Sequence, residues 1–199
     1  IPGKGYLAQG SEDGFGLKYA RSINDKALKK NNNQFVQVVS CNTHNIASLT
    51  NTIALTESED NLLEGRFVCI RRASDISQTS AYIPAPEVGR HNSDEFGTHH
   101  AQDAVELFKT INIKPNLFSS AMKVNSQYMH VIWFNIRLKN SITEEEVLRR
   151  LDSNKLIALT EKTSTSSVFS FGRDQGHYGR ILNQTVVVVP SLSVNSGKE

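Results

Sequence analysis

The chain has 199 residues, of which 38% are hydrophobic and 21% are charged, and its formal net charge is +2. These values predict a globular chain with one substantial core or, at most, two small ones. We expect no membrane or nucleic-acid partner, because no apolar stretch approaches the roughly 20 residues of a membrane span and no basic run is interleaved with aromatic residues.

Glycine-rich residues 1–16 predict an irregular connecting segment. They include GKGYLA at 3–8, which matches the glycine spacing of a dinucleotide-binding loop, but that loop requires a strand before it and a helix after it. The stretch LKYARSINDKALKK at 17–30 has a mixed helical pattern and ends at the turn-forming NNN. FVQVVS at 35–40 then predicts a β-strand.

Cys41 directly follows this strand. Apolar residues between Ile46 and Ala54 recur at helical spacing. Asn42 or Thr43 can supply a side-chain oxygen that caps the first amides of such a helix. We therefore expect Cys41 at a strand-to-helix corner.

The middle of the chain predicts a second strand, a loop and a helix. GRFVCIRRAS at 65–74 is the strand, and Cys69 is interpreted there as a small buried core residue. Residues 74–97 are loop-like, with IPAPEVG as the clearest breaker. THHAQDAVELFKTIN at 98–112 predicts a helix with Thr98 as a candidate cap.

Strands dominate the remainder. YMHVIWFNIRLK at 128–139 predicts a long strand, and the capping-box sequence from Thr143 to Glu146 opens a helix that runs to Leu151. Three further strands are expected at KLIALTEK, SSVFSFG and NQTVVVVP. Together these elements predict an α+β domain in which helices lie on one face of a mixed, mainly antiparallel sheet.

The corner at Cys41 could hold a nucleophile. Unpaired backbone N–H groups and the positive end of a helix dipole favour a thiolate there, and the same amides could receive an oxyanion. A nucleophilic cysteine also needs an imidazole within hydrogen-bond reach. Spacing alone does not choose among the six histidines, which are His44, His91, His99, His100, His130 and His177.

The alternative is that Cys41 is a packed thiol. Cys41 and Cys69 are the two cysteines of the chain, and they form no disulfide framework. A reducing cytoplasm is therefore the expected compartment.

The sequence THH at 98–100 has interpretations of its own. Two adjacent histidines at a helix start could bind an anion, because ring N–H groups and backbone amides point the same way. With His91 and Asp94 nearby they could also ligate a metal, but the spacing matches no zinc pattern. We therefore expect no metal site.

Six segments, in order, resemble the archaeal-type (type II) glyceraldehyde-3-phosphate dehydrogenases. FVQVVSCNT at 35–43 is similar to the active-site core V-V-S-C-N-T-T of that family. THHAQDAVELFKTINI is similar to its P-S-H-H helix, and MHVIWFNIRLK at 129–139 to its M-H-x-H strand. AQG with ARSINDKAL, IRRASD at 70–75 and NQTVVVVP at 183–190 resemble three further segments.

This resemblance implies the catalytic half of an oxidoreductase of glycolysis and gluconeogenesis. Residues 1–16 would connect to a preceding NAD(P)-binding Rossmann half, residues 17–190 would form the catalytic domain, and residues 191–199 would begin a C-terminal helix. The cofactor would be NAD or NADP, bound mainly by the preceding half. The partners would be a small phosphorylated aldehyde and inorganic phosphate, and the family implies a cytoplasmic homo-tetramer.

The resemblance also assigns roles to individual residues. Cys41 would attack the aldehyde to form a thiohemiacetal, which hydride transfer converts into a thioester and phosphate resolves to an acyl phosphate. His130 would be the general base that activates the thiol and stabilises the oxyanion. The other assignments place Ser40 and Asn42 beside the substrate carbon, His99 and His100 on the substrate phosphate, and Arg72 (less favourably Arg71) and Gln184 near the nicotinamide.

The chain departs from the family pattern close to the site. His44 stands at the second threonine of V-V-S-C-N-T-T, and Ile132 stands at the second histidine of M-H-x-H. Two alternatives follow. One is a semialdehyde or acyl-phosphate reductase on the same fold, with a changed substrate. The other is a non-catalytic binding module that keeps Cys41 as a packed thiol.

Overall fold

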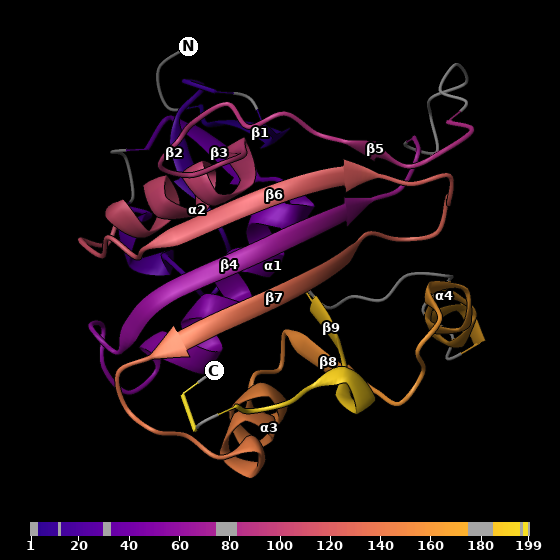
Figure 1. Cartoon of the computed structure of the whole chain (residues 1–199). Coiled ribbons are helices and arrows are strands. Elements are labelled where there is room, and N and C mark those ends of the chain that lie inside the picture. The colour runs from indigo at the N-terminus through magenta and orange to yellow at the C-terminus, as the bar shows by residue number, and fades with distance from the viewer. Residues whose placement is uncertain are drawn as a thin grey trace.

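The computed structural model describes residues 4–11, 13–29, 33–74, 83–174, 185–195 and 197–198, and of 171–174 the backbone alone. Over these residues the chain has the predicted α+β character, with helices set among three sheets (Figure 1). Within the same ranges, no helix is both long enough and apolar enough to cross a membrane.

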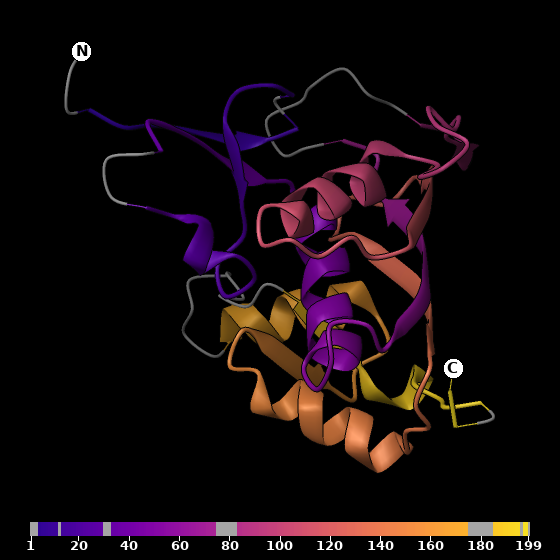
Figure 2. The same cartoon turned by 90° about the vertical axis from the view of Figure 1, so that its left-hand side faces the viewer.

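The largest sheet and two helices enclose the core. The four strands, in the order β5-β6-β4-β7, are Glu87–Val88, Leu117–Lys123, Leu62–Arg71 and Val131–Leu138. Helices α1 (Cys41–Thr50) and α2 (His99–Lys109) lie on the same side of this sheet (Figure 2). Large side chains buried between them include Phe67, Phe108, Leu107, Leu117 and Leu138. The prediction of helices on one sheet face is confirmed for α1 and α2.

Strand β6 is an element that sequence reasoning missed. Its sequence LFSSAMK has no β-branched residue, so local propensity gives little sign of a strand. The strand forms because it pairs in parallel with β4 along its whole length. Helix α2 lies between β4 and β6 in the chain and supplies the crossover that parallel strands need.

The strand directions of the largest sheet agree with the prediction. The sheet of β4, β5, β6 and β7 is mixed, as predicted, because β4 is parallel to β6 and antiparallel to β7. Two of its three strand pairings are antiparallel, so the expectation of a mixed, mainly antiparallel sheet is confirmed for this sheet. The two smaller sheets among the described residues contain parallel pairings, which the sequence did not predict.

A second sheet forms at the start of the chain. Its strands β1 (Tyr6–Gly10), β3 (Phe35–Val39) and β2 (Leu17–Tyr19) pair in the order β1-β3-β2, and both pairings are parallel. The irregular segment predicted for the N-terminus is therefore wrong over β1. The helix predicted after it is also wrong, because β2 and a short 3-10 helix, Asp25–Ala27, form there instead.

Local side-chain hydrogen bonds explain why this stretch is not helical. Asn24 accepts the backbone N–H of Ala20 at 3.0 Å and donates to the Lys18 carbonyl at 2.8 Å. Asp25 accepts the N–H of Ser22 at 3.0 Å, and Ser22 adopts a left-handed φ of 66°. Bonds of this kind offer the backbone an alternative to the helical ladder.

The C-terminal part contains α3 (Glu144–Ser153), β8 (Ile157–Thr160), α4 (Thr165–Asp174) and β9 (Thr185–Val188). Helix α3 begins as predicted, since the Thr143 hydroxyl accepts the Glu146 N–H at 3.2 Å. The strands predicted at KLIALTEK and NQTVVVVP are confirmed as β8 and β9, which pair in parallel.

The strand predicted at SSVFSFG is wrong, because these residues belong to α4. The N–H of Val168 donates to the carbonyl of Ser164 four residues earlier, at 3.0 Å, which is the helical pattern. Beyond β9 the chain makes a 3-10 turn, Val189–Ser191. Residues 192–195 and 197–198 contain no further helix, so the expected start of a C-terminal helix is not seen in them.

Helix α1 continues into a π-helical turn, Asn51–Leu55. Arg150 of α3 reaches this turn and donates from Nη1 to the Ile53 carbonyl at 2.8 Å. The same guanidinium bonds the Glu146 carboxylate at 2.7 Å and pairs with Glu57 at 2.5 Å. Arg150 is buried. Its bonds to Ile53 and Glu57 attach α3 to the end of the helix that begins at Cys41.

Candidate active site

Cys41 is the first residue of α1, at the strand-to-helix corner that the sequence predicts. Ser40 is the N-cap, and its hydroxyl accepts the N–H of Thr43 at 3.4 Å. The Ser40 carbonyl accepts the N–H of His44 at 2.9 Å. The N–H groups of Cys41 and Asn42 belong to the first turn, which has no intrahelical acceptor for them. Cys41 is exposed, so its sulfur can be reached by a substrate.

Cys41, His130 and Arg72 line one cavity of about 700 Å³. Arg72 follows the end of β4, and His130 precedes the first residue of the neighbouring strand β7. The start of α1 and the sheet therefore place on one cavity a cysteine and a histidine that are far apart in the sequence. A nucleophilic cysteine needs an imidazole within hydrogen-bond reach, and His130 is a histidine that lines the same cavity as Cys41.

A backbone hydrogen bond orients the ring of His130. The N–H of Arg72 donates to Nδ1 of His130 at 3.1 Å. Because Nδ1 accepts, the proton of a neutral imidazole must sit on Nε2. His130 in this state is a hydrogen-bond donor at Nε2.

The two histidines at the start of α2 form a compact pair, with ring centroids 4.0 Å apart. Nε2 of His100 lies 3.4 Å from the side-chain amide nitrogen of Asn42, which connects the pair to the first turn of α1. His100 and Asn42 are both buried. The substrate-side residues predicted around Cys41 therefore lie next to one another.

Burial lowers the pKa of both histidines in this pair. Burial, followed by the charges of His99, Arg71 and His130, lowers the pKa of His100 to about 3. Burial also lowers the pKa of His99, with Arg71 and Lys18 acting in the same direction and Asp103 opposing them. The positive charge of Arg71 thus disfavours the protonated form of both rings.

Several polar atoms here have no hydrogen-bond partner among the described residues. They are Nδ1 of His100, Oδ1 of Asn42 and Nε of Arg71, and all three are buried. Unsatisfied buried polar atoms are rare and call for an explanation. Two of the three, on Arg71 and on His100, can donate, which suits an anionic ligand held between α1, α2 and the end of β4.

Sequence reasoning missed the residues that hold α2 in place. Lys18 of β2 donates to the Asp103 carboxylate at 2.6 Å and pairs with Glu106 at 3.0 Å, and both partners belong to α2. The Ser119 hydroxyl of β6 accepts the Ala101 N–H at 3.0 Å and lies 2.6 Å from the Thr98 hydroxyl. Thr98 occupies the N-cap position, but Ser119 provides the capping oxygen. The available signal for Lys18 was its position between the apolar residues Leu17 and Tyr19.

Cys69 is buried, whereas Cys41 is exposed. It is completely buried in β4, and burial raises the pKa of its thiol to about 12. Arg71 acts in the opposite direction and Cys41 in the same direction, both less strongly than burial. The interpretation of Cys69 as a core residue is confirmed.

The remaining predicted residues lie apart from this site or outside the described residues. His44 is directed back to β3, where its Nδ1 donates to the Val39 carbonyl at 3.0 Å. His91 bonds the Ser120 hydroxyl at 2.9 Å and contacts Phe118. Gln184 and His177 lie outside the described residues. Over the described ranges, no group of three His, Cys, Asp or Glu side chains could hold a metal ion.

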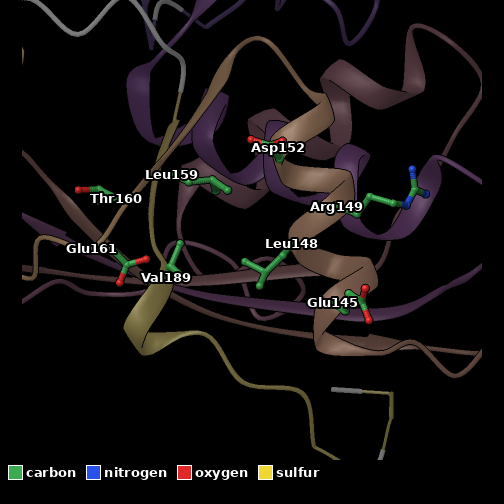
Figure 3. A pocket seen from close by; sticks show the side chains of 8 residues that line it. All are labelled: Glu145, Leu148, Arg149, Asp152, Leu159, Thr160, Glu161 and Val189. Atoms are coloured by element: carbon green, nitrogen blue, oxygen red, sulfur yellow. The ribbon is translucent and has the colours of Figure 1, made fainter.

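A second hollow, of about 460 Å³, lies between α3 and β8 (Figure 3). Leu148, Leu159 and Val189 line its apolar part, and acidic side chains such as Glu145 and Glu161 surround them. None of the predicted site residues lines it. Its carboxylates disfavour a phosphorylated substrate, so the cavity at Cys41 is the candidate site.

Comparison with known proteins agrees with this geometry. No family model matches the chain. The glyceraldehyde-3-phosphate dehydrogenase of Sulfolobus acidocaldarius is 28% identical over 98% of the chain and 56% of the relative. The enzymes of Thermococcus kodakarensis and Thermococcus sibiricus are 32% and 30% identical, each over 90% of the chain and 50% of the relative.

The chain therefore spans about half the length of the curated relatives it matches. The similarity covers the segments that carry Cys41, His99 and His130, because it extends over nearly all of the chain. The chain is a relative of the archaeal glyceraldehyde-3-phosphate dehydrogenases, as its motifs predict.

Proposed function

We propose that this chain is the catalytic domain of a phosphorylating aldehyde dehydrogenase that oxidises glyceraldehyde 3-phosphate to an acyl phosphate. One observation carries the proposal: exposed Cys41, at the N-terminus of α1, shares a cavity with His130 and Arg72. The similarity to enzymes named glyceraldehyde-3-phosphate dehydrogenase supports the choice of substrate.

Cys41 attacks the aldehyde carbon in the first step. The S–C bond forms as the carbonyl π-bond breaks, and negative charge develops on the oxygen. The N–H groups of Cys41 and Asn42 in the first turn of α1 stabilise this charge. Nε2–H of His130 is a suitable further donor, given the hydrogen bond that its Nδ1 accepts from Arg72. The role of His130 as general base toward the thiol stays a prediction.

We assign recognition of the anionic group to the part of the site formed by α2 and the end of β4. His99, His100 and Arg71 surround a position with unsatisfied buried donors, and we assign this position to the phosphate group of the substrate. A buried, uncharged His100 still donates one N–H, and Arg71 supplies the positive charge. Holding the phosphate there orients the aldehyde carbon toward Cys41.

We place Arg72 near the nicotinamide, because it lines the same cavity as Cys41 and His130. When bound, NAD or NADP accepts the hydride that leaves the substrate carbon. Gln184 keeps its proposed place near the nicotinamide. Inorganic phosphate then attacks the Cys41 thioester, the C–S bond breaks, and the thiolate is restored.

We further propose a cytoplasmic homo-oligomer, with the cofactor bound mainly by a separate half of the full protein. The sheet face opposite α1 and α2 supports an oligomer, because Trp133 and Val131 on it are 57% and 44% exposed. Large exposed apolar side chains of this kind would be buried in such an oligomer contact. A nucleophilic thiol is also best maintained in a reducing compartment.

The test is an assay of the full-length protein with glyceraldehyde 3-phosphate, NAD or NADP, and with or without inorganic phosphate. We expect phosphate-dependent cofactor reduction that Cys41→Ser abolishes. Cys69→Ala is the matched control, since it removes the other thiol of the chain from outside the cavity. Intact cofactor binding without turnover would contradict the proposed substrate.

A further inference from the structure

The connection from β6 to β7, residues 124–130, ends at His130 and is bonded to the chain that leaves β4. Strand β4 pairs with β6 as far as Arg71. The first residue of the connection, Val124, then donates its N–H to the Arg71 carbonyl at 2.9 Å. The connection thus passes around the end of β4 (Figure 1) and follows the chain beyond it.

Two further hydrogen bonds join these segments at the next residues. The N–H of Arg72 donates to Nδ1 of His130 at 3.1 Å, and the N–H of Ala73 donates to the Ser126 carbonyl at 2.8 Å. The first of these bonds sets the position of the proton on the neutral imidazole. Its geometry therefore depends on how firmly the two segments are held together.

Gln127 holds the next residue of the chain with both atoms of its side-chain amide. Its Oε1 accepts the N–H of Ser74 at 3.3 Å, and its Nε2 donates to the Ser74 hydroxyl at 2.8 Å. Ser74 is 7% exposed, whereas Gln127 is exposed. Two bonds to one residue fix its orientation as well as its position, and a buried N–H and hydroxyl are costly to leave without partners.

The residue between Gln127 and His130 that carries backbone strain is Met129. Its φ of 55° is left-handed, a conformation that is unfavourable for a residue with a Cβ atom. Such a conformation persists where the surrounding contacts determine it. The bonds of Gln127 to Ser74 and of His130 to Arg72 lie on either side of Met129 in the chain and supply these contacts.

We propose that Gln127 is a positioning residue for His130. By holding Ser74, it keeps the Arg72 N–H on Nδ1 of His130. The neutral ring, which lines the same cavity as Cys41, then carries its proton on Nε2. Without Gln127 the connection relaxes, the bond from Arg72 is lost, and either ring nitrogen can hold the proton.

The consequence for turnover rests on the proposed function. An Nε2–H can donate to the oxygen that becomes negative as the thiohemiacetal forms, whereas the other tautomer offers no donor at Nε2. A ring divided between two tautomers and orientations is therefore a weaker catalyst. The groups assigned to the substrate phosphate are on α2 and at Arg71, so substrate binding is affected less than the chemical step.

The direct test is the tautomer of His130, read by nitrogen NMR of the full-length protein with isotope-labelled histidine rings. His130→Ala identifies the signals of this ring by their loss. We expect the Nε2–H form in the unmodified protein and in Gln127→Glu, whose carboxylate still accepts from the N–H and the hydroxyl of Ser74. Gln127→Leu removes both bonds and should give a mixture of the two neutral forms. A single Nε2–H form in Gln127→Leu would overturn the proposal.

Kinetics of the same variants form the second test, with kcat expressed per alkylatable Cys41 so that unfolded enzyme does not count. Gln127→Leu should lower kcat by at least about tenfold and change the KM for glyceraldehyde 3-phosphate by less than about twofold. Gln127→Glu should restore kcat to within about threefold of the unmodified enzyme. The matched control is Gln34→Leu, the same change at an exposed glutamine outside the cavity, which should leave kcat unchanged.

The two tests separate this inference from the proposed function. If the unmodified protein does not turn over glyceraldehyde 3-phosphate, the proposed function fails, and the tautomer still decides whether Gln127 positions His130. A kcat that Gln127→Leu leaves unchanged, or lowers without altering the tautomer, would overturn the inference. An equal loss in Gln127→Glu would also overturn it, because the contact with Ser74 would then not be the cause.

Discussion

The buried ion pair between Lys18 and Asp103 offers a quantitative test of how α2 is held. The two side chains are 9% and 10% exposed, and their N–O distance is 2.6 Å. Lys18→Met keeps the aliphatic stem and leaves the Asp103 carboxylate without its partner. Removing one member of a buried pair typically costs about 3–5 kcal/mol. Glu106 is 33% exposed and Asp13 is 94% exposed, so their pairs with Lys18 add little.

We therefore expect Lys18→Met to lower the free energy of unfolding in urea by about 3 kcal/mol. The double variant Lys18→Met/Asp103→Leu should recover most of this loss, because no uncompensated charge remains. A single variant that loses less than about 1 kcal/mol, or a double variant no more stable than the single one, would refute the reasoning.

The pH dependence of the same pair has a definite sign. Burial lowers the pKa of Lys18, but hydrogen bonds to Asp103 and Glu106 raise it by more, so the pKa lies above its ordinary value of 10.5. A group with a raised folded pKa stabilises the fold below the unfolded pKa and loses this contribution as pH rises through the folded pKa. From about pH 9 to about pH 12, the unmodified chain should lose more stability than Lys18→Met.

Three further substitutions test other parts of the account. His130→Ala should cut turnover of the full-length enzyme by about 10²–10⁴-fold, and a loss below about tenfold would reassign its role to the histidine pair of α2. Ser119→Ala should cost about 1–2 kcal/mol in urea unfolding, because the N–H at the start of α2 loses its acceptor. Arg150→Met should cost about 3 kcal/mol, since the Ile53 carbonyl and Glu57 lose their donor, and an unchanged midpoint would contradict the role given to Arg150.

Local sequence patterns predicted those elements whose start or period is set by neighbouring residues. Thr143 with Glu146 is a capping pattern, and α3 begins there. An alternating run before Cys41 and helical spacing after it defined the corner, because strand and helix periods differ. The assignment of His130 as the partner of Cys41 came from motif resemblance, since nothing local connects residues so distant in sequence.

Predictions were wrong where distant contacts decide the structure. Strand β1 forms because β3 accepts it as a parallel neighbour, although its sequence is glycine-flanked and short. The stretch around Asn24 does not form the predicted α-helix, because the Asn24 side chain bonds the backbone of Lys18 and Ala20 and the Lys18 side chain bonds Asp103 of α2. The orphan donors on Arg71 and His100 could not be predicted at all, because they arise from burial between three elements.

The reactivity of Cys41 tests the central claim most directly. Iodoacetamide should alkylate Cys41 at about pH 7 faster than it alkylates a free thiol such as glutathione, because the sulfur is exposed at a helix N-terminus. Cys69 should stay unlabelled over the same period, since it is fully buried and the pKa of its thiol is about 12. Peptide mass mapping separates the two sites. Alkylation of Cys41 no faster than that of the free thiol would contradict its assignment as the nucleophile.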